Sequence, residues 1–366
     1  AGGGSAGGGS VGGGSAATPA KPETTTKPDG TKVETSANSD GSSVTESTAP
    51  NGSTGTVKTD KNGKTEAETK LSAKALEDAK KNGEAVKAPV EVEASRNSST
   101  APTVKVELPK GAGETKVEIP VSNANSGTVA VLVHPDGTEE ILKNSLPTEN
   151  GIRLTVNGGA TVKIIDNSKD FADTQNHWAK DAIDFVSARE LVNGIGNNLF
   201  DVSGEMTRGM VNTVLARLAG ANTEGGAKWY DKGTEWARTN GISDGTNPTA
   251  PVTREQLAAM LYRFAGAPAV SGALNFNDAN AVSEYARSAL LWATQNGILN
   301  GVGGDLAAPA APAERSGRDD AGALPAKRRL KPNPSRQREY VYAKAQIGAV
   351  LSSDLCFCLL FVDGTI

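Results

Sequence analysis

Apolar and polar residues alternate along several short stretches in the middle of the chain. In TVKVEL, Val104, Val106 and Leu108 fall on one face of an extended strand. The stretches TKVEIPV, TVAVLV, GIRLTV and ATVKII repeat this period of two, and Pro135-Asp136-Gly137 marks a turn between two of the strands. The pattern predicts a small antiparallel β-rich domain over residues 55–168.

Two local signals support the first part of this domain. Asn62-Gly63 is the preferred dipeptide of a tight hairpin. Ser72 is a good N-cap for a short amphipathic helix, and Gly83 would end it. By contrast, residues 1–54 are rich in Gly, Ser, Thr and Pro and have almost no large apolar side chains. We therefore predict a disordered linker there, because such a segment buries too little surface to offset its ordering entropy.

Beyond the strands, the apolar period becomes helical and the sequence repeats itself. MTRGMVNTVLARLAG at 206–220 aligns with VTREQLAAMLYRFAG at 252–266. TEWARTNGISDG at 234–245 aligns with LLWATQNGILNG at 290–301, and IDFVSARELVNG at 183–194 is a more distant copy. Each unit predicts a helix, a glycine-rich turn, a Thr-Arg cap and a second helix. A single unit has too small an apolar face to be stable, so the copies should pack together.

The second helix of each unit begins with a cation, which is an unfavourable position. Thr253 is the predicted N-cap and Gln256 completes a capping box, so Arg254 is the first helical residue. A positive charge there opposes the helix dipole and costs roughly 0.3–1 kcal/mol. In the first copy, Met210 replaces the capping-box partner, and Gly209 should weaken the helix start by roughly 0.5–1 kcal/mol. The arginines therefore require a functional explanation.

Composition excludes several classes of function. The 366 residues carry a net charge of −4, which argues against partners such as nucleic acid or an anionic membrane. No apolar stretch approaches the roughly 18–20 residues of a spanning helix, so we expect no membrane insertion. Cys356 and Cys358 lack the spacing of a zinc or thioredoxin site, and His134 and His177 belong to no catalytic motif. We predict no enzyme, no catalytic residues, no metal and no cofactor.

The repeats resemble the S-layer homology (SLH) domain of bacterial surface proteins. The resemblance rests on FADTQNHWAKDAIDFV, LFDVSGEMTR and VLARLAG in the first copy, KWYDKGTEWARTNGISDG and VTREQ in the second, and LNFNDANAVSEYARSALLWATQNGILNG in the third. It implies an α+β multidomain chain in which all-α SLH repeats, forming a pseudo-threefold bundle, follow the β-rich domain. The implied repeats are residues 169–220, residues 221–268 and an incomplete third copy at 269–305.

The resemblance implies an anchor that binds secondary cell-wall polysaccharide, an anionic polymer that often bears a pyruvate ketal. Helix N-termini attract anions, and an arginine beside one suits a carboxylate. The positions that match the family pattern are, as binding residues, Arg208 and Arg254; as caps, Thr207 and Thr253; as points of sugar approach, Gly194 and Gly245; as acceptors from sugar hydroxyls, Asp173 and Asp244; and as stacking aromatics, Trp178, Trp229, Trp236 and Trp292. The alternatives are core tryptophans, arginines that pair with neighbouring acids, and aspartates that hold turns or caps.

After GVGGDLA the family pattern breaks. The chain becomes rich in Arg, Ala and Pro, and we interpret residues 306–366 as an aberrant tail. Our hypothesis is a shifted reading frame, because GRDDAGAL at 317–324 read one nucleotide out of frame can encode a helix like AAMLYRF at 258–264. An incomplete third copy would weaken wall binding.

The leading interpretation is a non-enzymatic anchor of an extracellular protein at the bacterial cell wall, with S-layer or other surface assembly as a further partner. One alternative makes the β-rich domain an adhesin or carbohydrate-binding module tethered by the repeats. Another makes the chain the anchor of a surface hydrolase whose catalytic domain lies upstream. Because the sequence begins with Ala1 and shows no signal peptide, we expect a fragment or the C-terminal part of a longer protein.

Overall fold

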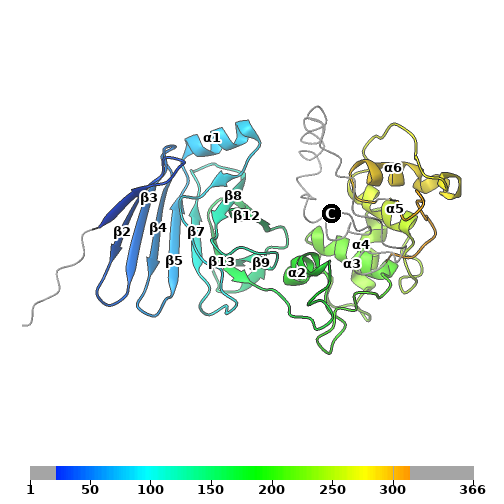
Figure 1. The fold of residues 1–366 in the computed structure, drawn as a ribbon, viewed down its shortest axis with the longest axis horizontal. Coiled ribbons are helices and arrows are strands. Elements are labelled where there is room, and N and C mark those ends of the chain that lie inside the picture. The colour runs from blue at the N-terminus through cyan, green and yellow to red at the C-terminus, as the bar shows by residue number, and fades with distance from the viewer. Residues whose placement is uncertain (1–21, 300, 314–366) are drawn as a thin grey trace, which may run out of the picture.

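A computed structural model of the chain describes residues 22–299 and 301–313. In Figure 1, a second, smaller sheet lies beside one end of a long sheet, and a group of helices lies beyond that end. We call residues 22–168 the β unit, and we call its first five strands the ladder. None of the helices within the described ranges is long and apolar enough to cross a membrane.

The ladder corrects the prediction of a disordered linker. Its antiparallel strands are β1 (Glu23–Thr26), β2 (Lys32–Ala37), β3 (Ser43–Thr48), β4 (Thr54–Thr59) and β5 (Thr65–Lys70). Most of it lies within the segment 1–54, so that prediction is wrong for residues 22–54, while residues 1–21 lie outside the described part. The error has a physical cause: these strands contain few large apolar residues, but threonine and valine favour extended backbone even when half exposed.

A regular turn sets the spacing of the ladder strands. Gly30, Gly41, Gly52 and Gly63 recur every eleven residues and have φ between 82° and 88°, the left-handed region that glycine tolerates best. The residue before each glycine is Asp or Asn. In the first turn, the Asp29 carboxylate accepts a hydrogen bond from the Thr31 amide at 2.9 Å, which fixes the turn locally. The predicted hairpin at Asn62-Gly63 is confirmed as the last of these turns.

The ladder continues into a two-sheet sandwich. One sheet has the order β1-β2-β3-β4-β5-β7-β13-β9-β10, and the other has the order β11-β12-β8-β6. The remaining strands are β6 (Val86–Lys87), β7 (Thr103–Glu107), β8 (Glu114–Pro120), β9 (Thr128–Val133), β10 (Glu139–Ile141), β11 (Leu146–Thr148), β12 (Gly151–Asn157) and β13 (Ala160–Asp166). The predicted alternation is confirmed, since Val104, Val106, Val117 and Ile119 are fully buried between the sheets.

The expectation of a purely antiparallel domain is wrong at two places. Strand β5 pairs with β7 in parallel, and β6 pairs with β8 in parallel. A parallel pair needs a long crossover, and helix α1 (Ala73–Asn82) supplies it between β5 and β7. Its predicted caps are confirmed: Ser72 accepts from the Ala75 amide, and Gly83 ends the helix with φ 71°.

The helices follow in the order of the predicted repeats, with two in repeat 1, two in repeat 2 and one in the described part of repeat 3. They are α2 (Lys180–Ala188), α3 (Arg208–Leu218), α4 (Asp231–Thr239), α5 (Arg254–Phe264) and α6 (Arg287–Gln295), with short 3-10 turns η1 (Ala279–Ala281) and η2 (Glu284–Ala286) before α6. Helix α3 packs on α4 and α5 packs on α6, so each second helix contacts the first helix of the next repeat. One apolar cluster joins all of them.

A closed ring of backbone hydrogen bonds links the three repeats. The Met206 amide donates to the Ala313 carbonyl (2.7 Å), the Ala313 amide to Val252 (2.9 Å), and the Val252 amide to Met206 (2.8 Å). Met206 and Val252 stand immediately before the threonine that caps the second helix of their repeats, and Ala313 takes the matching place in the ring for repeat 3. The repeats therefore meet through equivalent atoms.

The ring also corrects the boundary of the third repeat. The aberrant tail was expected from residue 306, but Ala307 and Ala313 are buried in the helical core and Ala313 closes the ring. Residues 306–313 therefore belong to repeat 3, and the sequence Ala-Pro-Ala at 311–313 matches Ala-Pro-Val at 250–252. The rest of the tail and its proposed frame shift lie outside the described residues.

Candidate functional site

The candidate site lies where the tip of one repeat's second helix meets the turn of the next repeat. We call the contact of α3 with the turn at 243–250 the first seam, and the contact of α5 with residues 307–311 the second seam. The two seams use the same bonds. The Arg208 amide donates to the Ala250 carbonyl (3.0 Å), and the Arg254 amide donates to the Ala311 carbonyl (2.9 Å).

These bonds change the reason for an arginine at a helix tip. The first amides of each helix were expected to be open to an anion, yet carbonyl groups of the next repeat already accept them. The Gly209 amide donates to Pro248 (2.7 Å), and the Glu255 amide donates to Pro309 (3.0 Å). Carbonyl oxygens carry partial negative charge, so a cation beside them is favourable. The dipole penalty is thus offset by the neighbouring repeat.

Arg208 holds the first seam with its side chain. Its Nε donates to the Thr246 carbonyl at 3.0 Å and one Nη to the Ser243 hydroxyl at 3.4 Å, while the same Nη forms an ion pair with Asp244. The Arg208 side chain is mostly buried, whereas that of Asp244 is exposed. One Nη of Arg208 therefore already binds a carboxylate at the protein surface.

Arg254 holds the second seam from a more buried position. It is 1% exposed, and its Nε donates to the Ala307 carbonyl at 2.9 Å. The described structure thus places the two predicted arginines at equivalent points, with Arg208 beside the exposed carboxylate of Asp244 and Arg254 almost completely buried. Direct access for a ligand differs between the two seams.

Both predicted threonine caps are formed. Thr253 accepts from the Gln256 amide, and the Gln256 side chain accepts from the Thr253 amide at 3.2 Å, which confirms the capping box. The expectation that Met210 leaves the first box open is wrong, because its Sδ accepts from the Thr207 amide at 3.4 Å. A thioether is a weak acceptor, so this box is the weaker of the two.

The predicted aspartates hold turns. Asp173 accepts from the amides of Phe200 (2.9 Å) and Asp201 (2.7 Å), and Asp278 does the same for Ala307 and Ala308 in repeat 3. Burial alone would raise the pKa of Asp173, but these amides outweigh it and leave the pKa below its usual value.

Asp244 combines a turn with the seam. It accepts from the amide and the hydroxyl of Thr246, both at 2.9 Å, and it pairs with Arg208. The Thr246 amide is the main reason that the pKa of Asp244 lies below its usual value. Asp244 therefore stays ionised at neutral pH and keeps the Arg208 fork occupied.

The two predicted glycines differ in what they permit. A Cβ on Gly194 would lie 2.5 Å from the Phe171 ring and 2.6 Å from the Leu199 carbonyl, so the protein's own atoms fill the space expected for sugar. Gly245 has φ 75° and lies in the turn of the first seam, where a left-handed residue is required.

Each repeat exposes one aromatic side chain just before its first helix. Trp178 is 38% exposed, Trp229 is 55% exposed and Tyr285 is 52% exposed, and the three occupy equivalent sequence positions. Sequence reasoning missed Tyr285 because it considered only tryptophans. The repeat alignment could have found it. Of the other predicted tryptophans, Trp292 is buried in the core and Trp236 packs against it.

The Tyr285 side chain lies at the tip of α5. Its hydroxyl donates to the Glu255 carboxylate at 3.1 Å, and Ser283 also contacts that carboxylate. Partial burial of the phenol raises the pKa of Tyr285 to about 12, and the charge of Glu255 acts in the same direction. The aromatic of repeat 3 is thereby fixed beside the residue that follows Arg254.

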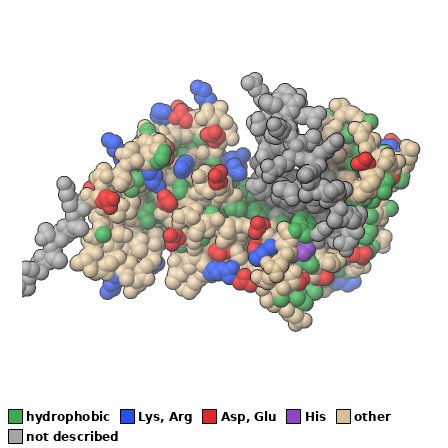
Figure 2. All heavy atoms as spheres, in the orientation of Figure 1, with side chains coloured by type: hydrophobic (Ala, Val, Ile, Leu, Met, Phe, Trp, Pro, Cys, Tyr) green, Lys and Arg blue, Asp and Glu red, His purple; other side chains and the backbone are tan. Residues whose placement is uncertain are grey.

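The β unit has a separate hollow of about 890 Å³. The ladder face contributes Val33, Thr45 and Val57, and the opposite wall is the segment 90–96. Figure 2 shows acidic and basic side chains mixed over the outside of the ladder, without a large patch of one sign on the face in view. The ladder thus offers no concentrated charge there for a charged polymer.

Comparison with known proteins identifies the helical repeats. The family model described as the S-layer homology domain matches residues 170–209 and 275–313. The second match ends at Ala313, in agreement with the corrected boundary of repeat 3. The chain therefore contains S-layer homology domains.

Similar proteins include three glycoside hydrolases. The chain is 27% identical to the exoglucanase XynX of Acetivibrio thermocellus over 47% of its own length and 18% of that protein. It is 28% identical to the amylopullulanase of Thermoanaerobacterium thermosulfurigenes, over 40% of the chain and 9% of the relative. The endo-1,4-beta-xylanase A of Thermoanaerobacterium saccharolyticum is 30% identical over 24% of the chain and 9% of the relative. The chain spans less than a fifth of each relative.

Proposed function

We propose that this chain anchors a surface protein to the bacterial cell wall without a covalent bond. S-layer homology domains anchor surface proteins in this way, and they bind cell-wall polysaccharide. The ring formed by Met206, Val252 and Ala313 supports the further proposal that the three repeats lie about a pseudo-threefold axis. Such an arrangement would present the same surface chemistry several times to one repetitive polymer.

The observation that carries the proposed site is the ion pair between Arg208 and Asp244 at the first seam. We propose that a carboxylate on the polysaccharide, such as that of a pyruvate ketal, takes the place of Asp244 on the Arg208 fork. Because Asp244 is exposed, releasing it to water costs little. The bidentate geometry of arginine then favours a planar carboxylate over other anions.

The other predicted residues support this seam in the proposal. Thr207 and Thr253 fix the helix tips, while Asp173 and Gly245 fix turns, and Gly194 packs within repeat 1. Trp178 and the exposed aromatics of the other repeats supply faces on which sugar rings stack. Arg254 is proposed to hold the second seam closed rather than to contact sugar first.

Sedimentation with purified cell-wall sacculi tests the proposal. Arg208→Gln should weaken binding at least tenfold, whereas Arg217→Gln, whose guanidinium bonds carbonyls inside the repeats, should leave the affinity within about twofold when the fold is intact. Mild acid treatment that removes pyruvate from the sacculi should weaken the wild-type chain to the level of Arg208→Gln. Equal affinity of wild type and Arg208→Gln would refute the proposed site.

The relatives favour a second candidate, in which this chain is the anchor of a glycoside hydrolase. All three named relatives are hydrolases, and each extends far beyond the matched part. The coding sequence upstream of Ala1 tests this candidate, because a continuous frame without a hydrolase domain would contradict it.

A third candidate makes the β unit a binding module, and the hollow beside the ladder is the observation that favours it. Thr45→Arg would place a longer, charged side chain in that hollow. If the intact chain binds a glycan array and Thr45→Arg abolishes that binding while Arg208→Gln does not, the β unit is the binding module. If Arg208→Gln abolishes it, the seams account for all binding.

A further inference from the structure

The first repeat differs from the other two in how its first helix ends. Helix α2 ends on Arg189, which is completely buried. Its Nε donates to the Ser145 carbonyl at 2.7 Å, and its two Nη atoms donate to the carbonyls of Ser126 (3.1 Å) and Thr128 (2.8 Å). These three acceptors belong to the β unit, so one side chain of the repeat ties together separate segments of that unit.

The other repeats provide an internal comparison. At the position of Arg189, helices α4 and α6 end on Asn240 and Asn296. Each asparagine donates its side-chain amide back to its own helix, to the carbonyls of Trp236 and Trp292, both at 2.8 Å. The repeats without a β unit beside them therefore use a short side chain that closes the helix locally. Only repeat 1 has a side chain long enough to leave it.

The helix also positions the arginine for this contact. The guanidinium carbon of Arg189 lies 3.7 Å from the centre of the Phe185 ring, one turn earlier in α2. One Nη also donates to the Phe185 carbonyl at 3.0 Å. The Phe185 ring and its carbonyl fix the Arg189 guanidinium within its own helix. The side chain therefore loses less conformational entropy when it bonds the carbonyl groups of the β unit.

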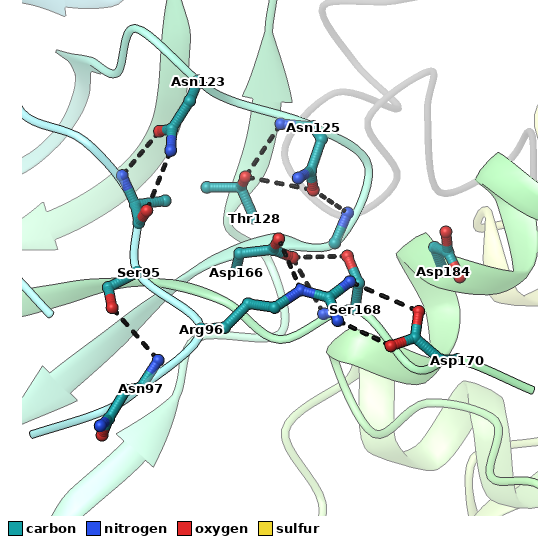
Figure 3. Close-up of polar contacts among 12 residues, drawn as sticks. Ser95, Arg96, Asn97, Asn123, Asn125, Thr128, Asp166, Ser168, Asp170 and Asp184 are labelled. Atoms are coloured by element: carbon teal, nitrogen blue, oxygen red, sulfur yellow. Dashed lines mark hydrogen bonds and ion pairs between the residues drawn. The ribbon is translucent and has the colours of Figure 1, made fainter.

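A second set of polar contacts crosses the same junction. Figure 3 shows Arg96 reaching from the β unit toward Asp166 and Asp170, which flank the chain segment that enters repeat 1. Hydrogen bonding and charge from Arg96 hold the pKa of Asp170 below its usual value. The Asn167 side chain, between the two acids, donates to the Ala188 carbonyl at the end of α2 at 2.6 Å. The connecting segment is therefore bonded on both sides rather than free.

Apolar packing continues across the junction. Ala188 of α2 is buried in a cluster with Val129, Val131 and Ile165 of the β unit. In the other direction, Leu146 of β11 is buried in the cluster that otherwise consists of helical repeats. Each unit thus contributes an apolar side chain to the other's core, as expected for parts that move together.

We propose that the β unit and repeat 1 form one rigid body, and that Arg189 is the residue that makes repeat 1 the docking repeat. The ladder is then a stiff arm projecting from the anchoring repeats rather than a domain on a flexible tether. The rigid-body part rests on the junction alone. The arm's role in holding cargo away from the wall rests on the proposed anchoring function.

Distance measurement between spin labels on the ladder and on α2 of repeat 1 tests the rigid body. Lys58→Cys and Asp181→Cys supply exposed label sites in the full chain, with Cys356 and Cys358 replaced by serine. The wild-type background should give one narrow distance distribution. Arg189→Asn, which copies repeats 2 and 3, should broaden it at least twofold. Arg217→Asn is the matched control, because it removes carbonyl bonds inside the repeats and should leave the distribution narrow.

Three results would overturn the proposal. They are a broad wild-type distribution, an Arg189→Asn distribution as narrow as wild type, and equal broadening by Arg217→Asn. If Arg189→Asn does not fold, Arg96→Ala at the exposed edge of the junction is measured in its place. Arg96→Ala should broaden the distance distribution, and an unchanged distribution would count against the rigid body. Sacculi binding by Arg189→Asn should match wild type. Loss of binding by Arg208→Gln with an unchanged distance distribution would separate the anchoring site from the junction.

Discussion

Gly194 offers a sharp test of whether a predicted site residue acts through packing or through ligand access. Gly194→Ala adds one methyl group at a point where the nearest atoms would be the Phe171 ring at 2.5 Å and the Leu199 carbonyl at 2.6 Å. Both distances are far below a normal carbon contact of about 3.5–4.0 Å. The ring can shift, but the carbonyl is held by a hydrogen bond from the Ile195 amide at 2.9 Å.

The expected cost follows from this crowding. Adding a methyl group at a well-packed position costs about 1–3 kcal/mol in free energy of unfolding. For a unit of 150–250 residues, that loss corresponds to a decrease in Tm of about 2–12 °C. Gly301→Ala in repeat 3 should cost less, because its Cβ would lie 2.8 Å from Phe276 and 3.2 Å from the Leu306 carbonyl.

Thermal and urea unfolding, followed by circular dichroism at 222 nm, measures the effect. Gly113→Ala is the control: it has no neighbour within 4 Å and no left-handed backbone, and should change stability by less than about 0.5 kcal/mol. An unfolding curve of Gly194→Ala that superimposes on wild type would refute the packing argument. Loss of sacculi binding together with such a curve would restore the role in sugar approach.

Three further outcomes are expected. Because amides hold the pKa of Asp173 below its unfolded value, the contribution of Asp173 to stability is present above about pH 4 and is lost as the pH falls further. Asp173→Asn should therefore reduce the loss of stability below about pH 4 in a plot of unfolding free energy against pH. An unchanged loss of stability in this pH range would contradict the prediction. Absorbance at 295 nm should show Tyr285 ionising near pH 12, and Glu255→Gln should lower the pKa of Tyr285. The stabilising effect of Tyr285 is present below about pH 10 and is lost as the pH rises through 12. A normal phenol titration in wild type would count against the contact between Tyr285 and Glu255. Thr253→Ala should lower the free energy of unfolding by about 1 kcal/mol through loss of the cap, and no change in urea midpoint would disprove it.

Local signals in the sequence predicted local structure well. The caps of α1 and α5, the turn at Asn62-Gly63 and the alternation of Val104 and Val106 each depend on neighbours a few residues away, and all are confirmed. The internal repeat also located the helices, because equivalent positions carry equivalent residues. Short-range physics and repetition were sufficient for these elements.

The first three strands of the ladder were missed because they carry a different signal. One face holds uncharged residues such as Val33 and Thr45, while the other holds charged residues such as Glu34 and Glu46. A search for apolar alternation does not detect a face built largely from threonine and serine. The eleven-residue spacing of Asx-Gly turns was visible in the sequence and would have predicted these hairpins.

The partners of the arginines could not have been predicted. Arg208 and Arg254 bond carbonyls in turns that lie tens of residues away, and a carbonyl has no sequence signature. The role of Arg189 could not be predicted from the sequence either. Its difference from Asn240 and Asn296 becomes meaningful only when the contacts of the three side chains are known. Contacts between repeats depend on tertiary geometry.

The turn spacing of the ladder makes its length adjustable in discrete increments. Each eleven-residue unit is one strand and one turn, so duplicating 33 nucleotides would widen the sheet by about 4.8 Å while leaving the sandwich core untouched. One added unit would move the chain entrance to the opposite end of the strands, and two would return it to the same end. Natural variants that keep the chain entrance at the same end should therefore differ in sheet width by steps of roughly 10 Å, the width of two added strands.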